Sequence, residues 1–316
     1  MSDIVDPAVR DPCIVTGFIE ANHLNFEVDQ CGEGDRLALC LHGFPEHSFS
    51  WRHQLPMLAE LGYRAWAPNM RGYGKSSRPP FVEDYAMSNL FADVAGLIDA
   101  ANCDETVLIA HDWGAVIAWQ FAMQKIRPLT KLVICNVPHP GPMGRVMRSG
   151  FAQLKRSWYV FFFQIPWLPE FMLGRRQARG VADAIRRSCT LKERFPEEVL
   201  EVYRRNAAQP GALTAMINYY RALLRGRSAR EPAGGYPVID TPTLMIWGEE
   251  DVALTKASTF GTEEFVSNLT IRYLPRISHW VQQEAPEVAN AMMKAFLLGE
   301  PVPEMEWQMA LVPHTA

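Results

Sequence analysis

The sequence predicts a strand-to-helix turn within Thr106-Val-Leu-Ile-Ala-His-Asp-Trp-Gly114. The apolar run at its start is typical of a buried strand, and an apolar helix follows from Ala115. A turn this tight needs small residues two before and two after its apex, and Ala110 and Gly114 meet that need. Such a nucleophile elbow holds its central residue strained and exposed above a sheet. That residue is Asp112, so we expect its carboxyl group at the functional edge of the sheet.

An aspartate at the apex indicates a particular chemistry. A carboxylate can attack an electrophilic alkyl carbon and form an alkyl-enzyme ester, which a second step must hydrolyse. The usual apex residue is serine, but the chain contains no Gly-x-Ser-x-Gly pattern, which disfavours a serine esterase, lipase or peptidase. From the turn alone, Asp112 could instead merely cap the following helix. His111 and Asp112 could also be a metal-binding pair, although such a pair belongs on a helix and this one follows a strand.

Further apolar runs place this turn in a parallel α/β sheet. Strands are predicted at 37–41, 65–67, 106–110, 131–135, 243–247 and 269–273. Helical periodicity at 88–101 and 286–298 indicates helices that cover both faces of the sheet. Leu24, Phe26 and Val28 alternate with polar residues and indicate an earlier, half-buried strand. We expect that strand to pair antiparallel with 37–41 across a glycine turn.

A helical insertion interrupts the α/β pattern. No strand pattern occurs from about Pro140 to Gly235, a stretch rich in arginine and aromatic residues. We therefore predict a core of residues 1–139 and 235–300, an inserted helical lid of residues 140–234, and a loosely packed tail of residues 301–316. The lid holds 17 Lys+Arg and 7 Asp+Glu, a net charge of +10. This surplus indicates either attraction of anionic substrates or simply solvated helix faces.

The composition excludes several classes of protein. The 316 residues are 48% hydrophobic with a net charge of −4, so the chain can bury a large core and no nucleic-acid partner is expected. No apolar run approaches the ~20 residues of a membrane-spanning helix, and the start of the chain does not resemble a secretory signal. The six cysteines form no close pairs and no Cys-x-x-Cys, which predicts a reducing, cytoplasmic location and no thiolate zinc site.

Two later segments supply partners for Asp112. Asp251 follows a late predicted strand, at the edge where open α/β sheets place functional groups. His279 lies 28 residues further on and could act as a general base on water, with Asp251 orienting its imidazole. On spacing alone, Glu249 and Glu250 are rival acids.

The loop at 42–46, His-Gly-Phe-Pro-Glu, follows the first central strand of the predicted sheet. A His-Gly loop in this place can aim a backbone N–H at the active site. Together with the N–H after the nucleophile, it would form an oxyanion hole. The candidate donors are the backbone amides of Phe44 and Trp113.

These segments together resemble the epoxide hydrolases of the α/β-hydrolase fold, over roughly residues 20 to 299. The matching pieces, in chain order, are 42–46 (HGFPE), 68–76 (PNMRGYGKS), 111–114 (HDWG), 136–140 (NVPHP), 248–251 (GEED) and 279–280 (HW). Asn69 is a departure, since the family often has aspartate there in a structural role. The resemblance implies an α/β-hydrolase core with an inserted helical lid, and it selects Asp251 as the acid.

The resemblance also implies two lid tyrosines that hold the epoxide oxygen. It assigns these roles to Tyr159, within 158–166, and to Tyr220, within Asn218-Tyr-Tyr-Arg221, with Tyr219 open as a one-residue alternative. The chemistry is reasonable, because a phenol can donate a hydrogen bond or a proton to the alkoxide that epoxide opening creates.

On this interpretation the chain is an epoxide hydrolase that needs no metal or cofactor. Asp112 would form the ester, His279 with Asp251 would activate a water, and the product would be a vicinal diol. A small apolar epoxide is the expected substrate. The side chains expected to wall its pocket are Trp113, Phe163 and Trp280. A role in detoxification and a homodimer are further expectations.

Two other functions stay open. A haloalkane dehalogenase resembles this fold and also uses an Asp-Trp pair, but it needs a second halide donor. Phe44 occupies one position for such a donor, while Trp158 or Trp167 could fill the other. A non-catalytic ligand receptor on this fold could lose its nucleophile, acid and base, yet all three are present here. Chloride release from short chloroalkanes would identify the dehalogenase.

Overall fold

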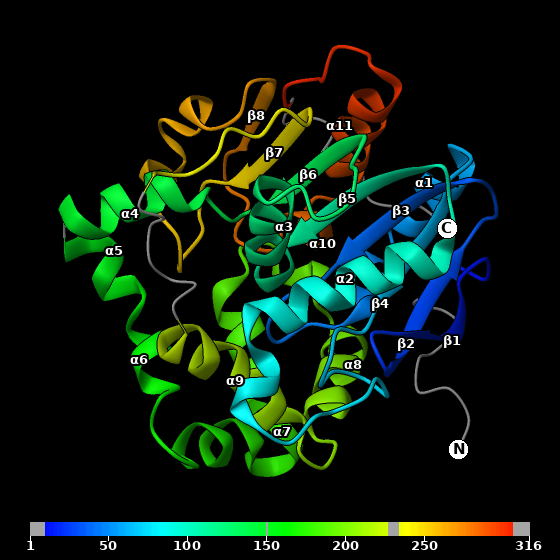
Figure 1. Ribbon diagram of the computed structural model, residues 1–316. Coiled ribbons are helices and arrows are strands. Elements are labelled where there is room, and N and C mark those ends of the chain that lie inside the picture. The colour runs from blue at the N-terminus through cyan, green and yellow to red at the C-terminus, as the bar shows by residue number, and fades with distance from the viewer. Residues whose placement is uncertain (1–9, 150, 227–233, 306–316) are drawn as a thin grey trace.

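A single sheet forms the centre of the molecule (Figure 1). The structure is a computed structural model that describes residues 10–149, 151–226 and 234–305, so the opening residues and most of the predicted tail, 306–316, lie outside the described residues. The strand order is β1-β2-β4-β3-β5-β6-β7-β8. The strands are β1 (Val15–Ala21), β2 (Leu24–Cys31), β3 (Arg36–Leu41), β4 (Arg64–Pro68), β5 (Glu105–His111), β6 (Lys131–Cys135), β7 (Thr243–Gly248) and β8 (Leu269–Leu274).

The strands from β3 to β8 run parallel, as their continuous apolar runs predict. Side chains alternate across the sheet, so Leu37 and Leu39 pack on one face while Ala38 and Cys40 pack on the other. The carboxyl ends of parallel strands open on one edge of the sheet. The residues that follow β5, β7 and β8 therefore meet at that edge.

The prediction that the strand at 24–28 pairs antiparallel with the strand at 37–41 is wrong about the partner strand. β2 pairs antiparallel with β1 and with β4, where Val28 lies opposite Pro68, and β4 separates it from β3. After β3, the chain passes through helix α1 (Gln54–Glu60) and returns as β4 parallel to β3, so β4 takes the place beside it. The sequence did not predict β1, because most of that strand is exposed or half-buried and shows little apolar alternation.

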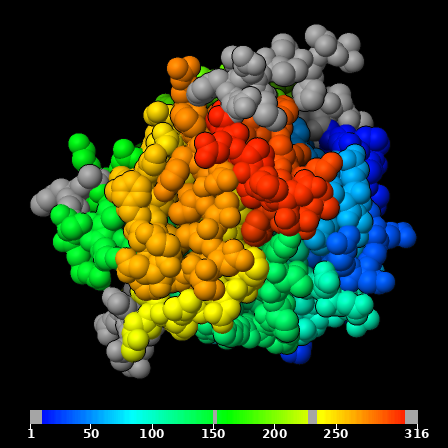
Figure 2. Space-filling model, turned by 90° about the horizontal axis from the view of Figure 1, so that it is seen from above, coloured from blue at the N-terminus to red at the C-terminus, as the bar shows by residue number. Residues whose placement is uncertain are grey.

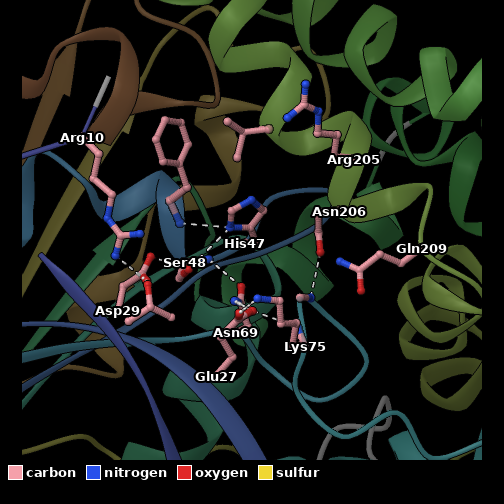
Figure 3. A pocket seen from close by; sticks show the side chains of 14 residues that line it. Arg10, Glu27, Asp29, His47, Ser48, Asn69, Lys75, Arg205, Asn206 and Gln209 are labelled. Atoms are coloured by element: carbon pink, nitrogen blue, oxygen red, sulfur yellow. Dashed lines mark hydrogen bonds and ion pairs between the residues drawn. The ribbon is translucent and has the colours of Figure 1, made fainter. Parts of the chain in front are cut away.

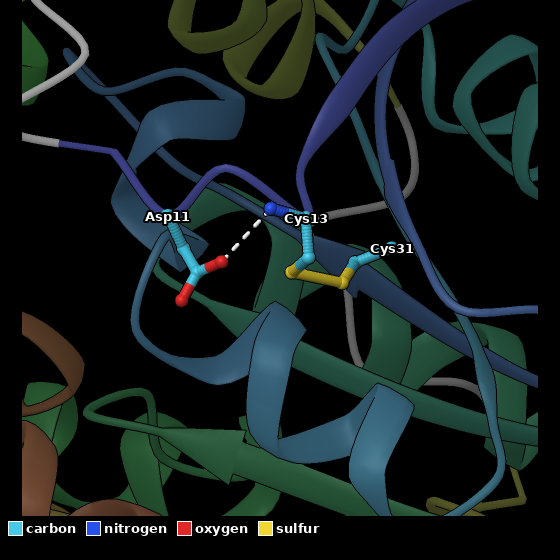
Figure 4. Close-up of a disulfide and its surroundings, with 3 residues drawn as sticks. All are labelled: Asp11, Cys13 and Cys31. Atoms are coloured by element: carbon cyan, nitrogen blue, oxygen red, sulfur yellow. Dashed lines mark hydrogen bonds between the residues drawn. A yellow bond between two sulfur atoms is a disulfide. The ribbon is translucent and has the colours of Figure 1, made fainter.

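Two of the six cysteines, which lie far apart in the sequence, are joined in the structure. Cys13 and Cys31 form a disulfide, with their Cα atoms 5.7 Å apart (Figure 4). The register of β1 and β2 sets Val15 opposite Gln30, which brings the two cysteines together across 18 residues of chain. Because disulfides are rare in reducing compartments, cysteine spacing no longer supports a cytoplasmic location.

Helices cover both faces of the sheet. α1, α10 (Val281–Glu284) and α11 (Pro286–Leu298) pack on one face, and α2 (Met87–Ala101) and α3 (Trp113–Met123) pack on the other. Figure 2 shows the red segment that contains α11 at the surface, beside the orange segment that contains β8. Short 3-10 helices connect these elements at η2 (Ser48–Trp51), η3 (Val82–Tyr85), η4 (Lys192–Arg194), η5 (Lys256–Thr259) and η6 (Thr262–Glu264).

Six helices occupy the described chain between β6 and β7, and we call them the lid. They are α4 (Pro140–Ser149), α5 (Phe151–Arg156), α6 (Trp158–Phe162), α7 (Leu168–Ser188), α8 (Glu197–Ala207) and α9 (Ala212–Arg225). The arrows of the sheet point toward the lid in Figure 1, so the lid lies beyond the carboxyl ends of the strands. Among the described residues, no helix combines the length and the apolar character of a membrane span.

Candidate active site

Asp112 lies at the apex of a strained turn between β5 and α3. Its backbone has φ 47° and ψ −121°, a conformation that residues other than glycine rarely adopt. The turn is also crowded, because a Cβ on Gly114 would lie 2.3 Å from the Leu41 carbonyl oxygen. A Cβ on Gly43 would lie 2.2 Å from the Cβ of Asp112. The two glycines therefore let the backbone of the turn and the side chain of Asp112 come close to β3 and the loop after it.

The carboxylate of Asp112 has one donor on each side. The Phe44 amide donates to its Oδ1 over 2.7 Å, and the Nε2 of His279 lies 3.5 Å from its Oδ2. Burial raises the pKa of Asp112, but the hydrogen bond and charge of His279 outweigh burial and hold that pKa below its usual value. Asp112 is therefore a carboxylate at neutral pH, the form that a nucleophile requires.

Asp251 and His279 form the second half of this arrangement. The Nδ1–H of His279 donates to the Oδ2 of Asp251 over 2.7 Å, and the side chain of Asn136 donates to the same oxygen over 2.9 Å. The other oxygen of Asp251 accepts the backbone amides of Ala253 and Leu254. The rival acid Glu249 is paired with a lysine instead, so the structure brings Asp251 to the histidine.

Charge balance governs the protonation of this pair. Burial raises the pKa of Asp251, but the charge of His279 and the hydrogen bonds lower it by more, so the pKa lies below its usual value. Burial lowers the pKa of His279, but the charge of Asp251 and the contacts with Asp112 raise it well above its usual value. In the resting site His279 is therefore protonated between two carboxylates.

A second buried pair lies directly beneath the turn. The Nδ1 of His111 lies 2.7 Å from a carboxyl oxygen of Glu46, and its Nε2–H donates to the backbone oxygen of His279 over 2.9 Å. The ring of His111 therefore bridges Glu46 and the backbone of His279. Glu46 also accepts the side-chain amides of Gln282 and Gln283. Through these hydrogen bonds, Glu46 and His111 connect the turn that carries Asp112 to the segment at 279–283 that carries His279.

Tyr159 and Tyr220 face the site from the lid. Their ring centroids are 5.9 Å apart, and the ring of Tyr220 lies 4.9 Å from that of Trp113, the residue after the nucleophile. Burial, and then the charge of Asp112, raise the pKa of both phenols. Tyr219 does not join them, because its hydroxyl donates to the backbone oxygen of Arg71. The structure thus brings the two resemblance-based tyrosines together near Asp112 and places their rival elsewhere.

Aromatic rings surround these groups. Phe163 packs against the rings of Phe44 and Tyr220, with centroids 5.3 and 4.8 Å apart. Trp280 lies against the ring of His279 and donates its indole N–H to Ser188 in the lid. The expected wall residues are thus all close to the site, although Trp280 also bonds the core to the lid.

The lid is hydrogen-bonded to the loop that carries the acid. Gln153 on α5 donates to the Ala253 carbonyl over 2.8 Å and accepts the Thr255 amide over 3.0 Å. The guanidinium of Arg156 donates to the backbone oxygen of Asp251 over 2.5 Å. The position of Asp251 therefore depends on lid residues as well as on β7.

Sequence reasoning did not assign a role to three of these residues. Glu46, His111 and Asn136 belong to segments that match the family, and His111 was otherwise considered only as half of a metal-binding pair. The available signal is position: His111 and Asn136 directly follow predicted central strands, and Glu46 lies in the loop after another, where parallel sheets gather functional groups. Asn69, the departure from the family pattern, is structural here: it accepts the Ser48 amide and donates to Glu27.

A separate polar cavity of about 90 Å³ lies between the core and α8 (Figure 3). Its side chains largely bond one another, as in the 2.6 Å ion pair of Arg10 with Asp29 and the 2.7 Å bond from the Gly74 amide to Asn206. None of the predicted site residues lines it. Over the described residues, no group of three His, Cys, Asp or Glu side chains is arranged to hold a metal ion.

Comparisons with known proteins identify the family of this chain. A family model described as alpha/beta hydrolase fold matches residues 39–264. Epoxide hydrolase 4 of Mus musculus is 36% identical over 301 residues, covering 93% of this chain and 82% of that protein. Epoxide hydrolase A of Mycobacterium tuberculosis is 31% identical over 314 residues, covering 89% of this chain and 96% of that protein.

Solved structures lead to the same family. The crystal structure of an epoxide hydrolase from Bacillus megaterium, in complex with an inhibitor, superposes with a TM-score of 0.82 and 29% identity. The match covers 89% of this chain and 100% of that one. The chain therefore belongs to the epoxide hydrolases, a family of enzymes of the α/β-hydrolase fold.

Proposed function

We propose that this epoxide hydrolase opens its substrate with Asp112 and releases the diol with His279, supported by Asp251. One observation carries the proposal: the Asp112 carboxylate lies between the Phe44 amide and the His279 imidazole, with two lid phenols nearby. A nucleophile, a base, an acid and an oxyanion donor are thus within one buried site. The division into a core of 1–139 and 235–300 and a lid of 140–234 is part of this proposal.

In the first step, an oxygen of Asp112 attacks one epoxide carbon as the bond from that carbon to the epoxide oxygen breaks. The released alkoxide takes a proton from Tyr159 or Tyr220, whose raised pKa values keep both phenols protonated at neutral pH. The product of this step is an ester of Asp112. Proton exchange with His279 restores the phenol.

The ester changes the electrostatics of the base. Esterified Asp112 no longer carries a charge, so one of the two carboxylates that raise the pKa of His279 is gone. The neutral imidazole then takes a proton from a water, whose oxygen attacks the ester carbonyl carbon. The Phe44 and Trp113 amides stabilise the oxyanion. When the intermediate collapses, the leaving diol oxygen takes the proton from His279, and the carboxylic acid left on Asp112 then gives its own proton to His279. The diol is released, and the site returns to an Asp112 carboxylate beside a protonated His279.

The aromatic walls support a small apolar epoxide as substrate. The rings of Trp113, the residue after Asp112, and of Phe163 both pack against the ring of Tyr220, with centroids 4.9 and 4.8 Å from it. A Bacillus megaterium relative was solved with its product, (R)-3-[1]naphthyloxy-propane-1,2-diol. Aryl glycidyl ethers and styrene oxide are therefore the first substrates to test. The homodimer, the cytoplasmic location and the role in detoxification stay predictions.

The decisive experiment traps the ester. His279→Gln protein is mixed with styrene oxide and, separately, with 1-chlorobutane, and the intact mass is measured. We expect the full mass of the epoxide to be added and peptide mapping to locate it on Asp112. Addition of a butyl group alone would identify a dehalogenase. Absence of any adduct, together with no turnover of an epoxide panel by the wild type, would refute the proposal.

A further inference from the structure

The outer surface of the lid carries a concentration of exposed apolar side chains. Trp167 is 81% exposed, Phe171 is 63% exposed and Trp158 is 62% exposed. Together with three neighbours they form what we call the lid face, which consists of Trp158, Phe161, Ile165, Trp167, Phe171 and Met172. All six fall within 15 consecutive residues. Monomeric proteins rarely leave so many large apolar groups together in water, so this surface is suited to a partner or a membrane.

Helical spacing places five of these side chains in two successive groups, each on one side of its own helical turns. Trp158, Phe161 and Ile165 are three and four residues apart, and the helical turns continue past α6, because the Ile165 amide donates to the Phe162 carbonyl. The Phe171 amide donates to the Trp167 carbonyl, so these two rings also lie on one side of a turn. In Figure 1, α5 and α6 lie at the outer margin of the molecule.

Positive charge surrounds the lid face. Residues 154–179 include only one acidic residue, Glu170, whose carboxylate is paired with Arg221 over 2.6 Å. The guanidinium of Arg175 lies 5.5 Å from the centroid of the Phe171 ring, which places a cation at the edge of the apolar surface. The basic residues of this stretch, all exposed, are Lys155, Arg156, Arg175, Arg176 and Arg179. Arg156 donates to the backbone oxygen of Asp251 and Arg179 lies 3.9 Å from Asp183, so the cations that count toward this charge are Lys155, Arg175 and Arg176.

We propose that the lid face docks on an anionic lipid surface. Exposed tryptophan and phenylalanine beside arginine and lysine is the composition of segments that bind in the membrane interface. Their cations are attracted to anionic headgroups. A second copy of the chain fits less well, because a two-fold contact buries the same surface of both copies and so brings their cations, Lys155 and Arg175 among them, into one interface. Like charges across such an interface repel, whereas an anionic bilayer neutralises them.

Docking in this way would bring a lipid layer close to the catalytic groups, an extension that rests on the proposed function. α6 has two faces: Trp158 and Phe161 point outward, while Tyr159 and the following Phe163 pack around Tyr220. One helix therefore separates the lid face from the ring cluster near Asp112. Apolar epoxides partition into bilayers, so we infer that they reach the site from the lipid.

The test measures binding to vesicles without substrate. Full-length protein is sedimented with vesicles of phosphatidylcholine alone and of phosphatidylcholine with phosphatidylserine, at low and high salt. We expect binding to the mixed vesicles that weakens with salt. In the double variant Trp167→Ser, Phe171→Ser, the affinity should fall about tenfold or more, because two exposed aromatic anchors are removed. The matched control is the double variant Phe81→Ser, Phe260→Ser, which removes two comparably exposed rings from the surface of the α/β core, away from the lid.

Three results would overturn the proposal. The wild type could fail to sediment with mixed vesicles, or the Trp167, Phe171 double variant could bind as the wild type does. Analytical ultracentrifugation could instead find a dimer that this double variant converts to a monomer, which would identify a second copy as the occupant. Styrene oxide hydrolysis is followed in parallel without vesicles. Absent hydrolysis with intact vesicle binding would refute the proposed function alone, and intact hydrolysis with absent binding would refute the docking alone.

Discussion

Replacing Glu46 by alanine provides a sharp test of the buried contacts beneath the nucleophile turn. In the wild type, Glu46 accepts hydrogen bonds from His111, Gln282 and Gln283 at 2.7, 3.1 and 2.6 Å, and it is fully buried. Alanine leaves these three donors without their acceptor. No water can reach them without disturbing a packed core.

The expected loss is large. An unsatisfied buried donor costs about 1–3 kcal/mol. Three buried donors lose their acceptor at once, so we expect Glu46→Ala to lower the free energy of unfolding by about 4 kcal/mol, near the low end of the sum over the three. For a chain of this size, that corresponds to an apparent melting temperature about 8 °C lower.

Differential scanning fluorimetry with three variants checks this value. Glu46→Gln keeps an oxygen for the two glutamine amides and can donate to a neutral His111, so its loss should be about half as large. Glu33→Ala removes an exposed glutamate and serves as the control, with no expected change. An unchanged melting temperature for Glu46→Ala would refute the view that these three buried donors depend on this carboxyl group. Equal losses for the alanine and glutamine variants would show that the amide contacts contribute nothing.

Three further outcomes are expected at the active site. Asp112→Ala, folded by circular dichroism, should lose diol formation entirely, and turnover at the wild-type rate would contradict the nucleophile assignment. Tyr220→Phe should lower kcat/KM about 100-fold. Tyr219→Phe should keep its activity and lose only about 1 kcal/mol of stability, because it loses the hydrogen bond to the Arg71 carbonyl. Equal losses of kcat/KM in the two variants would contradict the assignment of Tyr220. Asp251→Asn should slow ester hydrolysis about 100-fold or more and move the acid limb of the kcat profile to lower pH. Burial lowers the pKa of His279 and the Asp251 charge raises it, so without that charge the base stays neutral to lower pH; a limb that moves upward would contradict this.

The local features of this fold were predictable from sequence because they depend on neighbouring residues. The turn at Asp112 needs a strand, a small residue on each side and a helix, and all of these lie within a dozen positions. The parallel strands carry continuous apolar runs because both of their faces are buried. The order of strands at the sheet edge was not predictable in this way, since β4 separates β2 from β3 only through a distant crossover.

Residue chemistry and the family resemblance predicted the main members of the site but not the contacts between distant residues that support them. Asp112 and His279 follow strands that end on one edge, so their meeting follows from topology. The choice between Tyr219 and Tyr220 depends on the rotation of α9, which one sequence does not fix within a single residue. The bond between Glu46 and His111 spans 65 positions, and nothing in either local pattern distinguishes it from two unrelated polar residues.

The hydrogen bonds from α5 to the acid loop affect how this enzyme could be re-engineered. A chimera that exchanges the lid for that of a relative would also exchange Gln153 and Arg156, and with them the supports of the loop at 251–255. Specificity and catalytic geometry are thus inherited together in a lid transplant. Grafts that begin after Arg156 leave both supports on the recipient, and they are the junctions at which substrate range can be varied while the Asp251–His279 contact is retained.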